Sequence, residues 1–189
     1  MTRIEVLFDH PKRTLVVLAA VLAAIGIAIG SGATFTAQSA NPSNTFASGT
    51  LTMSNSKDNA AILTASNIKP GDTTQGTVDI QNTGSISGTF TVSRSALTNS
   101  DATNPLSGVL DLTIKDCGDF AAGTPTCDVG DPVKYSGTLG AMTSSVALGT
   151  YAASEKHRFE FKVTFQSGAG NEYQGDSSTA TFQWDATQS

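Results

Sequence analysis

Short runs in which apolar and polar residues alternate cover most of the chain after residue 44. The clearest run is 158–166, where Phe159, Phe161, Val163 and Phe165 fall on one side and polar residues fall on the other. This period of two is typical of a strand with one buried face and one solvent-exposed face. The run therefore predicts an antiparallel strand that covers a core from one side.

Seven further runs predict strands, and turn-forming clusters rich in Gly, Pro, Asn and Asp separate them. Residues 178–184 alternate in the same way, and we expect Trp184 to interrupt the pattern. After residue 34 no segment keeps an apolar period of 3.6, although one short helix over 139–145 is conceivable. Many short strands at such intervals predict an all-β sandwich or barrel, as a single domain over residues 45–189. The other six predicted strands are 45–53, 61–65, 76–81, 88–93, 109–115 and 146–150.

The N-terminal 33 residues have a different pattern. The basic pair Lys12 and Arg13 precedes a continuous apolar run over 15–30, and the small residues 31–33 follow it. This is the layout of a signal peptide. The alternative is a membrane anchor, but 16 helical residues at about 1.5 Å each reach only about 24 Å, short of the roughly 30 Å hydrocarbon core. We predict a signal peptide over 1–33, cleavage between Ala33 and Ala40, and an extracellular protein.

The remaining chain is acidic and sparsely charged. Only 14% of all residues are charged, and the chain after Ala33 keeps 8 basic and 14 acidic residues, a net charge of −6. No cluster of Lys and Arg stands out in it. Because phosphate binding depends on such clusters, we do not expect nucleic acid to be a partner.

Export changes the interpretation of the two cysteines, because thiols outside the cytoplasm oxidise and stay oxidised. Cys117 and Cys127 flank a short segment that contains two Gly and one Pro, which suits a loop between strands. The alternative is a metal site, but such a site needs about four ligands, and the chain after residue 33 has no other Cys and a single His, His157. We predict a disulfide between Cys117 and Cys127.

Catalytic signatures are absent from the sequence. The chain lacks both the G-x-S-x-G elbow of serine hydrolases and the H-E-x-x-H motif of zinc peptidases. His157 directly precedes the strongest strand, where we expect it to be exposed. His157 and Glu160 fall on opposite faces of that strand, so they cannot share a metal ion. We therefore predict no catalytic, cofactor or metal site and no enzyme activity.

Acidic residues gather around the predicted disulfide loop, and they suit either a solvated loop or a Ca²⁺ site. Their spacing fits no EF-hand, so Ca²⁺ is only the alternative here. These residues are Asp111, Asp116, Asp119, Asp128 and Asp131.

Several motifs together resemble the TasA/camelysin family of secreted biofilm-matrix proteins. They are residues 44–51, 66–72 and 81–85, followed near the other end by 173–175 and 179–184. The resemblance implies a jelly-roll-like β-sandwich, export through a dedicated signal peptidase and assembly into extracellular fibres. The family also carries a metallopeptidase label, for which no residue in this sequence supplies support.

Two of these motifs have a physical interpretation of their own. In Lys69-Pro70-Gly71-Asp72, Pro fixes φ at the first central position and Gly accepts a positive φ at the second, which predicts a type II turn. Asn82 and Gly84 likewise predict a turn between two strands.

Residues 34–44 are predicted to form an extended N-terminal arm, because Pro42 separates them from the first predicted strand. Phe35, Ala37 and Ser39 share one face of this arm. We expect it to be a donor strand that completes the sheet of a neighbouring subunit, and the alternative is a disordered terminus.

The predicted function is a structural subunit of a homopolymeric fibre, with signal peptidase and an accessory matrix protein as further partners. The alternatives are a monomeric surface-adhesion module and a camelysin-like metallopeptidase.

Overall fold

The computed structural model describes residues 11–30 and 47–188, which belong to two units, Met1–Phe46 and Ala47–Ser189. In the first unit, α2 (Pro11–Gly30) is a helix of 20 residues that contains the predicted apolar run. In the described part of the chain, no helix is both long enough and apolar enough to cross a membrane. The predicted arm, with Phe35, Ala37 and Ser39, lies outside the described residues.

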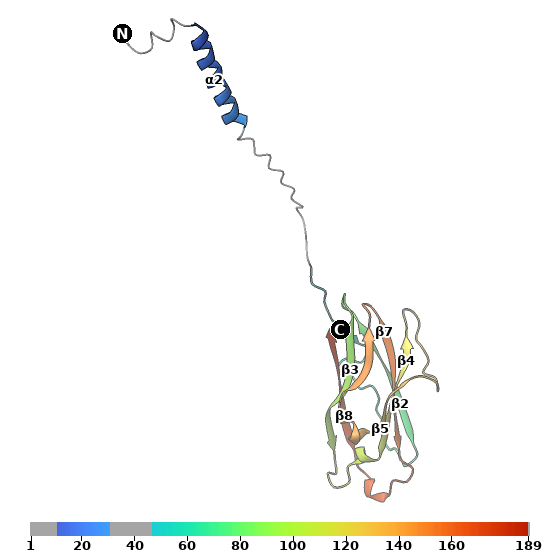
Figure 1. Cartoon of the computed structure of the whole chain (residues 1–189). Helices are drawn as coiled ribbons and strands as arrows, with labels where there is room; N and C mark the ends of the chain where they lie inside the picture. Colours follow the sequence, from blue (N-terminus) through green and yellow to red (C-terminus); the bar gives the residue numbers. More distant parts are fainter. Residues whose placement is uncertain (1–10, 31–46, 189) are drawn as a thin grey trace. The chain divides into compact units, whose positions relative to one another are not determined.

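The second unit is built from two antiparallel sheets (Figure 1). The five-stranded sheet has the order β1 (Met53–Asn55), β2 (Thr73–Asn82), β7 (Lys156–Phe165), β4 (Leu110–Asp119) and β5 (Val133–Thr138). The three-stranded sheet has the order β6 (Val146–Tyr151), β3 (Gly88–Asn99) and β8 (Ser178–Gln188). The prediction of an all-β antiparallel sandwich is confirmed.

The inner face of β7 forms the centre of the core, as its alternation predicts. Phe159 and Phe161 are fully buried there. Their rings meet the other sheet, with ring-centre distances of 4.9 Å between Phe161 and Phe182 and 5.6 Å between Phe159 and Trp184. Trp184 faces inward like Phe182, so the expectation that it interrupts the pattern was wrong. Burying each aromatic side chain stabilises the fold by about 1.5–3 kcal/mol.

Two predicted strands are largely absent. Only Met53 of the predicted 45–53 strand belongs to β1, and residues 47–52 are not a strand. Residues 61–65 form a loop in which Ile62 and Leu63 pack against the core. Apolar residues therefore reach the core from a loop here, without a strand partner.

The structure differs from the prediction in other segments too, and β4 and β8 continue to Asp119 and Gln188, beyond the predicted ends of their strands. β5 was not predicted; apolar and polar residues alternate in it only over 133–136. β3 continues to Asn99, beyond the predicted end of its strand. The short helix expected over 139–145 is a single 3-10 turn, Leu139–Ala141.

The turn at 69–72 has the predicted geometry. Gly71 has a φ of +91°, and the amide of Asp72 donates to the carbonyl oxygen of Lys69 at 2.9 Å. The Asp72 carboxylate closes the turn, because it accepts from the Lys69 amide at 3.0 Å and pairs with the Lys69 ammonium at 3.2 Å. This turn leads directly into β2.

Candidate functional site

The two long sides of the sandwich differ. On one side β5 and β6 lie next to each other, and the ammonium of Lys134 on β5 donates to the carbonyl oxygen of Leu148 on β6 at 2.7 Å. On the other side the sheets end in β1, which has only three residues, and in β8, which has eleven. The sandwich is therefore bridged at β5 and β6, and β8 offers a long sheet edge.

A groove runs along β8 on this second side. It consists of two hollows of about 820 Å³ and about 910 Å³ that share Ile62, Ala180 and Phe182 in their walls. The first hollow reaches Met53 and Trp184, and the second reaches Val163 and Phe165 deeper in the core. Apolar side chains of both sheets thus line the second hollow, whereas polar residues between Ser54 and Asn59 line much of the first.

The β8 strand itself lacks the residues and bulges by which proteins usually protect an edge strand, although loop residues 60–62 line the first hollow together with Thr181 and Trp184. Such edges carry Lys or Pro, bulge away from partners, or are very short. β8 contains no Lys, Arg or Pro, and Asp185 is its only charged residue. Among the described strands only β3 pairs with β8, and the one register shift between them lies in β3, between Arg94 and Ala96. Edges of this kind are prone to pair with a further strand.

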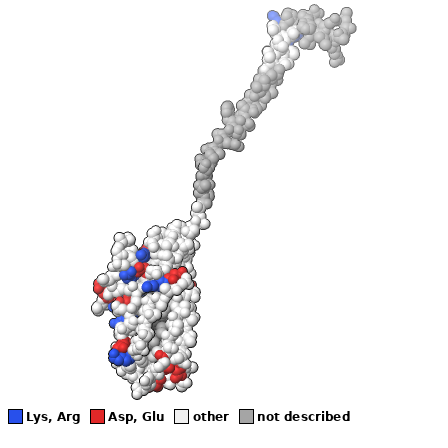
Figure 2. Space-filling model, turned by 180° about the vertical axis from the view of Figure 1, so that it is seen from behind, with Lys and Arg blue, Asp and Glu red and all other residues white. Residues whose placement is uncertain are grey.

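Charges do not dominate the visible surface. On the face that Figure 2 shows, acidic and basic side chains form small mixed groups separated by uncharged surface.

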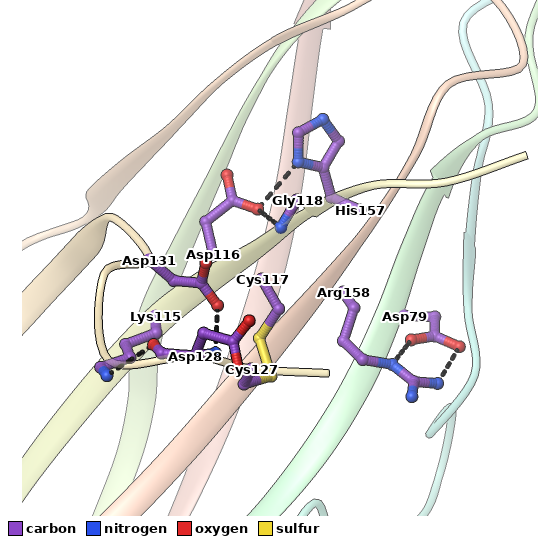
Figure 3. The surroundings of a disulfide bond; sticks show 10 residues. All are labelled: Asp79, Lys115, Asp116, Cys117, Gly118, Cys127, Asp128, Asp131, His157 and Arg158. Atoms are coloured by element: carbon purple, nitrogen blue, oxygen red, sulfur yellow. Dashed lines mark hydrogen bonds and ion pairs between the residues drawn. A yellow bond between two sulfur atoms is a disulfide. The ribbon is translucent and has the colours of Figure 1, made fainter. Parts of the chain in front are cut away.

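A polar cluster closes the core at the end where β7 begins. His157 continues the inward face of β7 by one step beyond Phe159, and Asp116 does the same for β4 beyond Ile114. The imidazole Nδ1 of His157 lies 2.9 Å from Asp116 Oδ1, and its Nε2 lies 2.9 Å from Glu155 Oε1 (Figure 3 shows the first contact). Lys134 completes the cluster, with its ammonium 3.3 Å from Asp116 Oδ2. Opposite charges therefore balance at a largely buried site.

Burial and charge act in opposite directions on these groups. Burial alone would lower the pKa of His157, but the hydrogen bonds to Asp116 and Glu155 outweigh it and raise that pKa above its ordinary value. Burial opposes ionisation of Asp116, yet the bond from His157 holds the pKa of this carboxyl below its usual range. The bond from His157 likewise lowers the pKa of Glu155. The cluster thus favours a protonated histidine between two carboxylates.

The predicted disulfide is present. Cys117 at the end of β4 is bonded to Cys127, with 4.7 Å between their Cα atoms (Figure 3). A β-bulge in β4 between Asp116 and Asp119 accompanies it, with Gly118 at φ +97°. The Gly118 amide donates to Asp116 Oδ1 at 3.1 Å, so the bulge also orients the carboxylate that contacts His157.

Asn82 and Gly84 hold the same end of the sandwich together. The fully buried amide of Asn82 donates to the carbonyl oxygens of Ile86, Tyr151 and Ala152, at 2.8, 3.2 and 3.0 Å, and its oxygen accepts from the Gly84 amide at 3.0 Å. A Cβ at Gly84 would overlap the carbonyl oxygen of Thr50. These motif residues therefore join three segments of the chain.

The described residues do not fit a zinc peptidase centre, which needs three protein ligands and an open position. His157 is the only histidine in the described part of the chain, and carboxylates occupy both of its ring nitrogens. Both cysteines are in the disulfide. Within residues 11–30 and 47–188, no group of three or more His, Cys, Asp and Glu residues could hold a metal ion.

Sequence reasoning placed some of these residues correctly and missed the polar cluster. The turn residues 69–72, Asn82 and Gly84 all lie in turns or at strand ends. Lys69 and Pro70 also line the second hollow of the β8 groove, whereas Asn82 and Gly84 line neither hollow. The expectation of an exposed His157 was wrong, because its side chain is only 14% exposed. Its partner Asp116 lies 41 residues away in the sequence. A signal for both side chains was present in the sequence. The alternation of β4 continues from Ile114 to Asp116, and that of β7 extends back from Phe159 to His157, which places both side chains inward.

Comparisons with known proteins agree with the resemblance seen in the motifs. A search of curated proteins found no match. The model of the camelysin metallo-endopeptidase family matches residues 12–115, which is more than half of the chain. This chain therefore belongs to the camelysin metallo-endopeptidase family.

Proposed function

We propose that this protein is a secreted structural subunit of extracellular matrix fibres, in which residues 34–40 of one subunit pair with the β8 edge of the next. The observation that carries this proposal is the edge of β8, eleven residues long and without Lys, Arg or Pro, beside a groove whose second hollow is mainly apolar. Strand addition to such an edge obtains affinity from backbone hydrogen bonds and specificity from pockets for alternate side chains.

The pattern of the arm matches the pattern of the groove. Phe35, Ala37 and Ser39 share one face of an extended arm, and Ala180, Phe182 and Trp184 share the inward face of β8. Antiparallel pairing in which Phe35 lies opposite Trp184 or Phe182 places apolar side chains together in the groove. Ser39 then lies toward Ser178, at the more polar start of β8.

Donor and acceptor are different surfaces of the same chain. A contact between unlike surfaces is head-to-tail, and it propagates as a filament when its rotation does not close a ring. The arm becomes a free end only after the signal peptide is removed, so export by signal peptidase and assembly outside the cell belong to the same proposal. An accessory matrix protein that starts or anchors fibres would use the same edge or arm.

The proposal is tested with the secreted protein and three variants. Deletion of residues 34–40 should leave the far-ultraviolet circular dichroism spectrum unchanged and abolish filaments in electron micrographs. Phe35→Asp should do nearly the same, because a charge cannot enter the apolar groove at low cost. Thr36→Asp is the matched control, since Thr36 lies on the opposite face of the arm, and it should assemble normally. Filaments that form at the normal rate without residues 34–40 would refute the proposal.

Peptidase activity is the second candidate function, and the description of the family favours it. Since the His, Cys, Asp and Glu side chains in the described part of the chain do not form a zinc site, we assign no residue to such a reaction. A homogeneous preparation that cleaves casein and loses this activity on chelation would establish it.

A further inference from the structure

We propose that His157 is a pH-sensitive clamp on the end of the sandwich that holds residues 50–52, the segment that follows the arm in the chain. The protonated side chain keeps this end closed, and loss of its proton loosens it. The inference concerns the folded domain itself and does not depend on fibre assembly.

The contacts of the ring require its protonated form. A neutral imidazole has one N–H donor and one lone pair, whereas a carboxylate only accepts. The two ring nitrogens lie 2.9 Å from carboxylate oxygens of Asp116 and Glu155, so both must donate. Removing the proton turns one hydrogen bond into a contact between two lone pairs, at a side chain that is only 14% exposed.

The surroundings of the ring contain few other titratable groups. β4 contributes Asp116 and, across the bulge, Asp119 as backbone partner of His157, while β5 contributes Lys134. The turn before β7 contributes Glu155. β6 contributes Tyr151, whose ring stacks on the imidazole at 4.3 Å and 5°, and whose buried hydroxyl has a raised pKa. Opposite His157 on β2 lies the apolar Ile80. Of all these groups, only the imidazole ordinarily titrates near neutral pH.

The neighbours of His157 in the chain belong to another environment. Lys156 and Arg158 lie over the ring of Phe120, at 4.4 and 5.7 Å. Arg158 also pairs with Asp79 at 2.7 and 2.9 Å. Arg158 is therefore a charged neighbour that can be changed without removing either bond of His157.

Glu155 connects the histidine to the turn at the end of β2. The carboxylate of Glu155 accepts from the backbone amide of Ala152 within the same turn. The backbone carbonyl oxygen of Glu155 accepts from the backbone amide of Asn82 at 2.9 Å. The carbonyl oxygen of Asn82 in turn accepts from the Ser154 amide at 2.9 Å. The turn that holds Glu155 is thus bonded to the end of β2 in both directions.

The turn after Asn82 holds residues 50–52. The amides of Thr83 and Ser85 donate to the carbonyl oxygens of Thr52 and Thr50, at 2.9 and 2.8 Å. The Thr50 amide donates to the Ser85 hydroxyl at 2.9 Å. A continuous set of hydrogen bonds therefore leads from His157 through Glu155 and Asn82 to residues 50–52.

The direction of the pH effect follows from linkage. The folded-state pKa of His157 lies above its unfolded value. The stabilisation is therefore complete below the unfolded value of about 6.5 and is lost as pH rises through the higher, folded value. This end of the sandwich should therefore open less often in mildly acidic solution than in alkaline solution.

Hydrogen exchange of the full chain, followed by NMR, tests the clamp. Protection factors, corrected for intrinsic exchange, are compared at about pH 6 and about pH 9, on either side of the titration of a histidine with a raised pKa. The amides of Thr83 and Ser85 should lose protection at the higher pH, whereas the amides of Phe161 and Val163 in the middle of β7 should not. Equal protection of Thr83 and Ser85 at both pH values would overturn the proposal.

Two variants separate the histidine from other causes. His157→Gln should show low protection of Thr83 and Ser85 at both pH values, and Arg158→Gln should keep the pH dependence of the wild type. If His157→Gln does not fold, the NMR signal of the His157 ring is titrated in the wild type instead, and its midpoint is compared with the pH at which protection is lost. His10→Gln assigns the signals of the two histidines. A ring midpoint that does not coincide with the loss of protection, or pH dependence that persists in His157→Gln, would also refute the clamp.

Discussion

Replacement of Asn82 by Ala should be among the most damaging single changes in this protein. The side chain is fully buried; its two N–H groups are shared among the carbonyl oxygens of Ile86, Tyr151 and Ala152, and its oxygen accepts from the Gly84 amide. Ala leaves these backbone groups without the side-chain partner. A hydrogen bond contributes about 1 kcal/mol net, and an unsatisfied buried group costs about 1–3 kcal/mol, so we expect a loss of about 3–5 kcal/mol. Whole domains are stable by only about 5–15 kcal/mol.

Equilibrium unfolding in urea measures this loss, and the chain supplies its own probe. Trp184 is the only tryptophan and is 9% exposed, so its fluorescence should change on unfolding. Asn82→Asp keeps the shape but cannot donate, and we expect at least as large a loss. Asn171→Ala, at an exposed position, is the matched control and should stay within about 0.5 kcal/mol of the wild type. A loss below about 1 kcal/mol for Asn82→Ala would refute the role assigned to these bonds.

Four further predictions concern stability and processing. Changing Cys117 and Cys127 together to Ser should lower the free energy of unfolding by at most about 3 kcal/mol without abolishing the fold, because the closed loop is short; two free thiols in the secreted protein would contradict the disulfide. Gly84→Ala should cost about 1–3 kcal/mol, because the new methyl group overlaps Thr50, whereas Gly168→Ala, with no atom within 4 Å of its Cβ, should be neutral in the same urea assay. Stability should also fall in acid, as pH drops through the lowered pKa values of Asp116 and Glu155, and an unchanged acid limb in Asp116→Asn would contradict that assignment. Mass spectrometry of the secreted protein should place its N-terminus between Thr34 and Asn41, and an exported form that retains residues 15–30 would indicate an anchor instead.

Alternation along the sequence was sufficient to predict the strands that cover the core from one side. β7 and β2 begin and end within a few residues of the predicted runs, because each has one buried and one exposed face. The signal fails where burial does not depend on a strand. Ile62 and Leu63 pack against the core from a loop. In β5 the sequence alternates over only four residues, and burial does not alternate with it, because Lys134 is half-buried like Tyr135.

The polar cluster illustrates what a local pattern leaves out. His157 and Asp116 continue the inward faces of β7 and β4, so alternation places both side chains inward. Their contact, however, depends on the pairing of β4 with β7 and on the bulge at Gly118, which bring together residues that are 41 positions apart. The groove beside β8 has the same origin, since only the sheet order shows that β8 is an edge strand.

Disulfide trapping tests strand addition at β8 most directly. In the predicted arm Gln38 falls on the face opposite Phe35, and Thr179 and Thr181 lie on the outward face of β8. Antiparallel pairing places Gln38 opposite Thr181 when Phe35 faces Trp184, and opposite Thr179 when Phe35 faces Phe182. Secreted protein that carries Gln38→Cys together with Thr181→Cys or Thr179→Cys should therefore form a ladder of covalent multimers on mild oxidation, visible on non-reducing gels. Gln38→Cys combined with Ser136→Cys, on the edge strand β5, is the matched control and should remain monomeric. A ladder from the β5 pair, or none from either β8 pair while filaments still form, would contradict the assignment of β8 as the acceptor.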